Sequence, residues 1–374
     1  MKEMMYAGLR FIFRTQNDRI QTHVTCQRMD SRLRKEVEIL TPQNSSGTKI
    51  TKHISPGLTL FLLAPVLGEL LSGHQPPLEF FNPLSLIILS LPYGCGALIC
   101  RELVVRWKKG FISLLLLGAA YGMFEEGIVV RSFFNPNWGE LGNLGRYSHV
   151  AGITWTYAEV LIHFHVIVSI TASVMLAEML YPDKRHESWI NNKALAGCFL
   201  ALLLWILAGF FMTSYMPSLG LYIIAWLSIF GLVWTARHIQ IRPQHAVSVP
   251  GPWWFWLLGV VNMSVFFFTV FLTPEYSEPP YFVTALLLLA LDGGTLWLIL
   301  RWSGNGFAWD DRHRLFLIAG ALSFFIYACI DQDLEKWQGS SIVGILAIVA
   351  LWQLKRRVFA RVGDSNEDLI LKSV

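Results

Sequence analysis

The chain has 374 residues, of which 54% are hydrophobic, 14% aromatic and only 15% charged. Water-soluble proteins carry about 25% charged residues, so this composition, with a mean hydropathy of +0.46, excludes a cytosolic enzyme, a nucleic-acid-binding module and a disulfide-stapled secreted domain. It predicts an integral membrane protein whose partner is the lipid bilayer and whose net charge of +4 reflects basic cytoplasmic loops.

The five cysteines are scattered along the chain, and most of them lie inside apolar segments. Cysteine in such segments behaves as a small hydrophobic side chain. An odd number of cysteines without a CxxC pair predicts neither a disulfide framework nor a cysteine-based metal site.

Residues 1–54 differ in composition from the rest of the chain, with ten Lys or Arg among mostly polar residues. The apolar patch from Met4 to Phe13 is interrupted by Arg10 and is too short for a signal peptide. We therefore predict a basic cytoplasmic tail that is partly disordered or lies on the membrane surface.

From residue 55 onward, apolar segments recur that have the length a helix needs to cross the hydrocarbon core. They cover residues 56–72, 84–100, 110–131, 154–181, 193–215, 219–237, 253–273, 280–301, 314–331 and 340–357. The first is short and contains Pro65 and Glu69, so a tilted or re-entrant segment is an alternative there. The expected fold is an all-α transmembrane bundle of about ten helices over residues 55–358.

The distribution of basic residues supports this topology, because Lys and Arg concentrate in cytoplasmic loops. Of the 30 Lys and Arg, only Arg131, Arg146 and Lys336 lie in the loops assigned to the outer side. We predict a multi-pass protein of the plasma membrane with both termini in the cytoplasm, including a C-terminal tail over residues 359–374.

The third predicted helix brings ionisable groups into the membrane. Glu125 and Glu126 follow the small residues of Gly118–Gly122 and precede Arg131. Small residues allow helices to pack closely, and two adjacent carboxylates project about 100° apart on a helix, so at least one should face the interior. A structural ion pair with Arg131 is the alternative to a catalytic role.

The fourth helix carries Thr156, Glu159 and His163 at a spacing that places them on one face. His165 lies about 200° further round and aligns with Ser169 instead. Since ionisable groups inside a membrane are costly, they are candidates for function. We predict that the outer ends of these two helices bring the glutamates and both histidines together, the alternative being ordinary packing residues.

Two further features accompany this cluster. The 23-residue outer connection Ser132–Thr154 is rich in Gly, Asn, Pro and aromatic residues, which suggests an ordered, lid-like loop over an outward cavity. Asp292 is followed by Gly293 and Gly294, and such a sequence near mid-membrane should weaken a helix, as in discontinuous transporter helices.

A series of motifs in fixed order resembles an uncharacterised family of prokaryotic polytopic membrane proteins. The motifs are Gly68-Glu69-Leu70-Leu71-Ser72-Gly73, Pro76-Pro77-Leu78-Glu79-Phe80-Phe81-Asn82-Pro83, Arg101-Glu102-Leu103, Tyr121-Gly122-Met123-Phe124-Glu125-Glu126-Gly127 and Ser132-Phe133-Phe134-Asn135-Pro136-Asn137-Trp138. The resemblance covers residues 55–185. It implies a membrane protein and directs attention to Glu125, Glu126 and His165, but implies no activity.

The paired Glu125 and Glu126 are also similar to those of CAAX-type intramembrane proteases, in which paired glutamates, an arginine and two histidine motifs activate water. The spacing departs from that pattern: four residues separate Glu126 from Arg131 instead of three, and Leu161 stands four residues before His165 where Phe is expected.

These features lead to three hypotheses. In the first, the protein is an intramembrane hydrolase with Glu125 or Glu126 as general base and with His163 or His165 polarising a carbonyl or binding a metal. A divalent metal such as zinc is possible, although no HExxH motif is present. The rivals are a proton- or cation-coupled transporter with the same carboxylates, and a membrane assembly protein without chemistry.

Overall fold

The fold was obtained as a computed structural model, which describes residues 54–244, 248–276, 279–335 and 338–372. The chain divides into two units, Met1–His53 and Ile54–Val374. The basic tail predicted for residues 1–54 lies outside the described residues, except for Ile54. The helices named below all belong to the second unit.

Helices occupy all ten predicted segments. The first half contains α3 (Pro56–Pro65), the π-helical segment η1 (Val66–Leu70), α4 (Pro77–Phe80), α5 (Pro83–Arg106), α6 (Phe111–Met123), the π-helical η2 (Phe124–Val129), α7 (Asn143–Ser148), β1 (His149–Val150), β2 (Ile153–Thr154), α8 (Trp155–Phe164), the π-helical η3 (His165–Ala172) and α9 (Ser173–Leu180). After the 3-10 turn η4 (Pro182–Lys184) follow α10 (Asn192–Met212), α11 (Leu219–His238), α12 (Pro252–Tyr276), α13 (Tyr281–Trp302), α14 (Asp311–Glu335) and α15 (Ser340–Lys372).

Eight of the helical stretches in the described ranges are long and apolar enough to cross a membrane. The stretch Pro56–Leu70 is shorter, which agrees with the expected irregularity of the first segment. The tenth segment lies in α15, which is not among the eight and continues to Lys372. Residues 359–372, expected as part of a tail, are therefore helical. The all-α polytopic bundle is confirmed.

Polar residues at the helix starts explain where several helices begin. The side chains of Ser55, Asn82, Asn191 and Ser218 each accept a hydrogen bond from a backbone N–H in the first turn of α3, α5, α10 and α11. Such N-caps satisfy donors that have no partner inside the helix.

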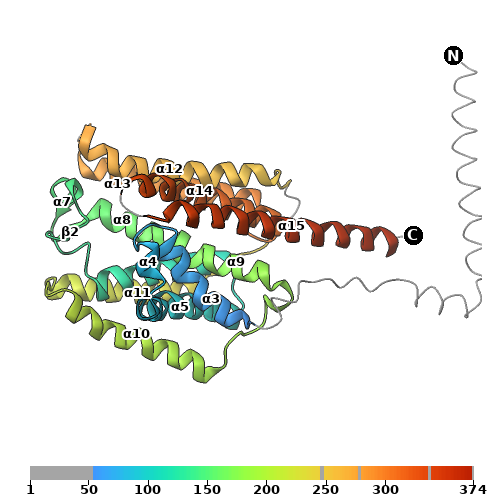
Figure 1. Ribbon diagram of the computed structural model, residues 1–374, viewed down its shortest axis with the longest axis horizontal. Coiled ribbons are helices and arrows are strands. Elements are labelled where there is room, and N and C mark those ends of the chain that lie inside the picture. The colour runs from blue at the N-terminus through green and yellow to red at the C-terminus, as the bar shows by residue number, and fades with distance from the viewer. Residues whose placement is uncertain (1–53, 245–247, 277–278, 336–337, 373–374) are drawn as a thin grey trace, which may run out of the picture. The chain divides into compact units, whose positions relative to one another are not determined.

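The bundle is centred on the continuous helix α8–η3–α9. In an apolar 18-residue stretch of this helix, 83% is buried inside the protein, against 11% in the corresponding stretch of α10. On one side of it α10 packs on α5 and α11 on α6, while on the other side α12, α14 and α15 lie beside one another (Figure 1). The outer helices expose large apolar side chains, as lipid-facing helices do.

The connection Ser132–Thr154 is ordered in the structure, as predicted. It contains α7 and the two-residue antiparallel strands β1 and β2. The Thr154 N–H donates to the Phe133 carbonyl at 2.8 Å, and the Tyr147 and Thr284 hydroxyls lie 2.7 Å apart. The loop is therefore tied both to itself and to α13.

The expectation of a broken helix at Asp292 is wrong. Helix α13 runs as a continuous α-helix from Tyr281 to Trp302 through Gly293 and Gly294. Two glycines cost about 1 kcal/mol each relative to alanine, which is small beside the cost of leaving backbone groups unbonded in lipid. The irregular backbone lies elsewhere, in η1, η2 and η3.

Candidate functional site

Three π-helical segments carry ionisable residues that the motifs singled out. Glu69 lies in η1, Glu125 and Glu126 in η2, and His165 at the start of η3. A π-helical turn changes the direction of the side chains that follow it, and such turns are frequent at functional positions. Because η1 and η3 pack against each other, as do η2 and α8, these segments converge.

The first cluster centres on Glu126 and His165, and we call it the Glu–His cluster. The Nε2 of His165 lies 3.2 Å from the Glu126 Oε1, and the Ser132 hydroxyl donates to the other carboxylate oxygen. The Nδ1 of His165 lies 3.1 Å from the Ser169 hydroxyl. The His165 and Glu126 side chains are 1% and 13% exposed, so the pair is held away from bulk water.

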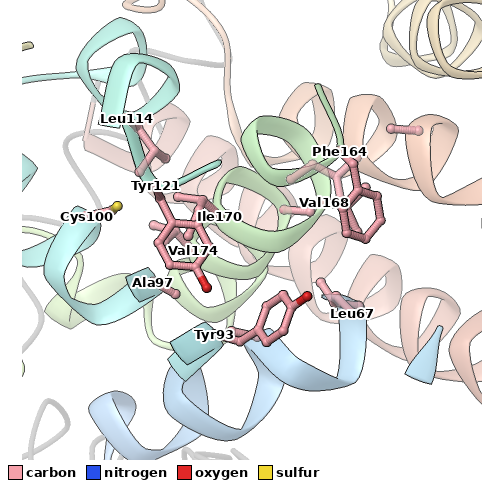
Figure 2. Packing of buried hydrophobic residues seen from close by; sticks show 14 of the residues in the cluster. Leu67, Tyr93, Ala97, Cys100, Leu114, Tyr121, Phe164, Val168, Ile170 and Val174 are labelled. Atoms are coloured by element: carbon pink, nitrogen blue, oxygen red, sulfur yellow. The ribbon is translucent and has the colours of Figure 1, made fainter. Parts of the chain in front are cut away.

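Two tyrosines enclose this pair. Figure 2 shows Tyr93 and Tyr121 among the buried side chains around η3, and their ring centroids lie 6.0 Å and 5.4 Å from that of His165. Glycines make room for them: a Cβ on Gly68 would lie 2.5 Å from the Tyr93 ring, and one on Gly96 would lie 2.2 Å from the Tyr121 ring. The close packing depends on these small residues.

Glu125 and Arg131 face other neighbours. The Trp205 indole of α10 donates to the Glu125 Oε1 at 3.0 Å. The Arg131 guanidinium donates to the Gly209 and Thr213 carbonyls at the C-terminal end of α10, where a cation is favoured. The alternative of a structural ion pair between Arg131 and the glutamates is therefore not found among the described residues; Arg131 anchors α10 instead.

A second group of polar residues lies in a cavity of about 390 Å³ between α6, α8, η3, α9, α12, α13 and α14. Most of its lining is apolar. The polar residues in the lining are Glu159, His163, Thr171, Asn262, Asp292 and Thr295. We call this space the intramembrane cavity. A largely apolar pocket with a few converging polar groups is the usual form of a ligand site.

Within the cavity lining, His163 and Asp292 form a pair. The Nδ1 of His163 lies 2.9 Å from the Asp292 Oδ2, and the Asn262 amide donates to the Asp292 Oδ1 at 2.9 Å. The His163 ring stacks on Phe266 with centroids 3.8 Å apart. The His163 Nε2 and the Glu159 Oε2 are buried and have no hydrogen-bond partner among the described residues. The Asp292 side chain is 37% exposed.

Four of the six predicted site residues thus fall into two sites. Glu126 and His165 meet, whereas Glu159 and His163 line the intramembrane cavity on the other side of α8–η3. The expectation that all of them share one cavity is wrong. The reason is the 200° separation of the two histidines, which turns His165 toward η2 and His163 toward α13.

Metal binding has little support from the geometry. Within residues 54–244, 248–276, 279–335 and 338–372, no group of three or more His, Cys, Asp or Glu side chains is arranged to hold a metal ion. The cysteines Cys95, Cys100, Cys198 and Cys329 are buried free thiols.

Sequence reasoning did not foresee that Asp292 is the partner of His163 or that Asn262 holds Asp292. Asp292 stood out as a polar group inside an apolar segment, but it is 129 positions away from His163 and 30 positions away from Asn262. No local pattern links positions so far apart. Only the tertiary packing of α12 and α13 on α8 brings them together.

Comparison with known proteins supports the membrane assignment. Neither a curated protein nor a solved structure matches the chain. Residues 58–235 match the model of an uncharacterized membrane protein family, a range that includes Glu126, His163 and His165 but ends before Asp292. The resemblance predicted from the motifs is confirmed, and over these residues the chain is similar to that uncharacterized membrane protein family.

Proposed function

We propose that the protein is an intramembrane hydrolase that cleaves an ester or amide bond of an amphiphilic substrate in the intramembrane cavity. The observation that carries this proposal is the His163–Asp292 pair. It combines a histidine oriented through Nδ1 with a cavity lining that can receive an apolar molecule.

The pair has the form of a general base with an orienting carboxylate. A carboxylate bonded to Nδ1 fixes the tautomer that carries the proton on Nδ1 and leaves the Nε2 lone pair to accept a proton. Asn262 and the Phe266 ring hold the two side chains in place. Nε2 is buried and has no hydrogen-bond partner among the residues that the structure describes, so no donor there competes for it, and water reaches it when the cavity lining shifts.

In the proposed reaction, water is the nucleophile. His163 Nε2 takes one proton from the water as the oxygen bonds to the carbonyl carbon, and Glu159 accepts a hydrogen bond from the remaining O–H. The imidazolium then gives its proton to the leaving oxygen or nitrogen as that bond to carbon breaks. The products are a carboxylic acid and an alcohol or amine, and His163 returns to its neutral form.

The lining of the cavity points to the substrate class. Apolar side chains from α6, α12, α13 and α14 surround the polar end, so an acyl chain or another apolar group fits beside it. Only 17% of the 18-residue apolar stretch of α13 is buried inside the protein, which leaves much of this helix to face lipid. A substrate dissolved in the bilayer would reach the cavity beside α13.

The same proposal includes the topology. We propose that both termini lie in the cytoplasm of a cell whose plasma membrane holds the protein, with residues 1–54 as a cytoplasmic tail and residues 359–374 extending on the same side. The basic ends of α5, α9, α11 and α13 would then face the cytoplasm.

A second candidate function is proton-coupled transport, favoured by the Glu–His cluster. Glu126 and His165 are buried, hydrogen-bonded and carried by π-helical segments. Buried carboxylate and histidine chains serve as proton relays in transporters. This candidate predicts pH-driven uptake that is lost in Glu126→Gln and retained in His163→Gln.

The hydrolase proposal is tested with the protein in lipid nanodiscs and 4-nitrophenyl esters of increasing chain length. We expect hydrolysis that favours long chains, a 10² to 10⁴-fold loss in His163→Gln, and a large loss in Asp292→Asn. The matched control is Asp331→Asn, which changes an exposed carboxylate of α14 and should keep wild-type activity.

If His163→Gln hydrolyses the esters as fast as Asp331→Asn, the proposal is refuted. If only Glu126→Gln abolishes a measured activity, the Glu–His cluster is the active centre and the cavity is not. Thermal unfolding of each variant separates a loss of chemistry from a loss of fold. The assembly-protein hypothesis gains if the wild type shows neither hydrolysis nor uptake.

A further inference from the structure

A second cavity of about 480 Å³ lies where α5 ends, α6 begins, α9 ends and α14 begins. The charged residues that line it are Arg101, Lys108, Lys109, Glu178, Arg185 and Arg314. We call it the basic pocket. By the proposed topology these helix ends all face the cytoplasm.

The charge in the basic pocket is unbalanced. Five Lys or Arg line it against a single carboxylate, that of Glu178. Two acidic residues behind the lining, Glu102 and Asp311, pair with Arg101 and Arg185 at 2.9 Å and 2.7 Å. Even when both are counted, the cations outnumber the anions, so the pocket attracts an anion.

Some of these cations have structural partners and others have hydrogen-bonding capacity left. Arg101 is fully buried and donates to backbone carbonyls between α9 and α10. By contrast, Arg314 lies 3.7 Å from Asp311, and its Nε has no hydrogen-bond partner among the described residues. The indole Nε1 of Trp309, a lining residue that is 5% exposed, also lacks a partner there.

Among the five cations that line the basic pocket, Lys108 is the exposed one. It has a φ of 54°, which is unusual for a residue with a side chain, and it lies in the short turn between α5 and α6. The adjacent Lys109 instead donates to the Ile239 carbonyl at 2.9 Å. This leaves Lys108 without a structural hydrogen bond of the kind that holds Lys109.

We infer that the basic pocket binds a phosphate group, and that the group belongs to an anionic lipid. Arginine, lysine and indole N–H groups are donors that match phosphate oxygens. Basic pockets between transmembrane helices on the cytoplasmic side are suited to anionic head groups. The pocket holds this ligand whether or not the intramembrane cavity performs hydrolysis.

The apolar surroundings favour a lipid over a soluble phosphate. Phe111 and Met175 line both the basic pocket and the intramembrane cavity, so the two spaces adjoin. Further apolar lining of the basic pocket comes from Val104, Leu114 and Val174. A molecule with a phosphate head and an apolar chain can therefore occupy the basic end and extend along apolar side chains.

The test uses the full chain in detergent micelles and fluorescently labelled dioleoyl phosphatidic acid, with labelled dioleoyl phosphatidylcholine as the zwitterionic comparison. We expect phosphatidic acid to bind at least tenfold more tightly. Arg314→Gln and Lys108→Gln should each weaken it about fivefold, as expected for one charge near a membrane surface. The matched control is Arg301→Gln, which removes a charge from the same end of the bundle outside the pocket.

Competition with glycerol phosphate identifies the source of the phosphate. Displacement only by millimolar glycerol phosphate supports a lipid ligand, whereas displacement at the lipid's own concentration supports phosphate recognition but overturns the lipid assignment. Equal affinity for the two lipids, or an equal loss in Arg301→Gln, overturns the inference. If Arg314→Gln fails to fold, the affinity of the exposed Lys108→Gln variant for phosphatidic acid decides whether the inference holds.

Discussion

A close glycine contact between α12 and α14 gives a sharp test of the packing of the bundle. A Cβ added to Gly320 of α14 would lie 2.1 Å from the Trp256 carbonyl oxygen of α12, and one added to Gly259 of α12 would lie 2.4 Å from the Leu317 carbonyl oxygen of α14. The two helices therefore meet backbone to backbone. Both also line the intramembrane cavity, through Gly259 and Leu317 among others.

The expected effect of Gly320→Ala follows from these distances. Carbon–oxygen contacts settle at about 3.3 Å or more, so α12 and α14 must separate by about 1 Å. Overpacking of this kind costs about 1–3 kcal/mol, and the opposing gain in helix propensity is about 1 kcal/mol. Because the obstacle is backbone and cannot move aside as a side chain would, we expect the upper end of the overpacking cost, which leaves a net loss of about 2 kcal/mol.

Gly293→Ala on α13 is the matched control, since nothing lies within 4 Å of the position a Cβ would take there. Only the helix-propensity term remains, so this variant should be stabilised by about 0.5–1 kcal/mol. Unfolding by SDS in mixed micelles measures both free energies. If Gly320→Ala is as stable as Gly293→Ala, the α12–α14 packing is wrong, and so is the shape of the cavity between them.

Three further outcomes are expected. Arg101→Met should lower the unfolding free energy by about 1.5–3 kcal/mol, because it removes the charged hydrogen bonds of Arg101 to Glu102 and to backbone carbonyls, although Arg106 still pairs with Glu102; an unchanged SDS midpoint would contradict this. Glu126→Gln should cost about 1.5–3 kcal/mol through its bond to His165, against no measurable change for the exposed Asp331→Asn. Burial alone would raise the pKa of Asp310, but hydrogen bonds from its neighbours on α14 hold that pKa well below its usual range. The ionised carboxylate then stabilises the fold fully above about pH 4, and this contribution is lost only as the pH falls through the lowered pKa. Asp310→Asn should therefore lower the melting temperature at pH 7 and lower it less at pH 2; an equal deficit at both pH values would refute it.

The positions of the helices along the chain could be predicted from the sequence because they depend on local properties. Length and hydropathy place a helix in every predicted segment, and the capping residues mark several of their starts. The close packing of α6 on η3 also followed from small residues: a Cβ on Gly118 or Gly122 would lie 3.1 Å from η3 atoms. Each of these features is encoded within one segment.

The π-helical segments and the partners of the ionisable groups were not accessible in this way. A π turn changes the hydrogen-bond register of a helix because packing against neighbours favours it, and the segment alone carries no sign of it. Likewise the helical positions of His163 and His165 separate their directions, but which side chain each meets depends on how α13 and η2 pack. The neighbours of Arg131 on α10 required the same knowledge.

The hydrogen bond between Ser132 and Glu126 could be predicted only in part. Ser132 belongs to a motif and stands six residues after Glu126, which suggests proximity but not a bond, because a turn must bring the chain back. The left-handed backbone of Arg131, with φ of 61°, makes that turn. Its need for such a conformation was not visible in the sequence, since residues other than glycine seldom adopt it.

The central claim is that water activated by His163 attacks the substrate in the intramembrane cavity. It is tested most directly by hydrolysing 4-nitrophenyl palmitate with the protein in nanodiscs in H₂¹⁸O and following labelled palmitate by mass spectrometry. We predict that ¹⁸O enters the carboxylate at the rate of 4-nitrophenol release in the wild type, and only at the rate of empty nanodiscs in His163→Gln. Equal labelling rates in the two proteins would contradict the claim.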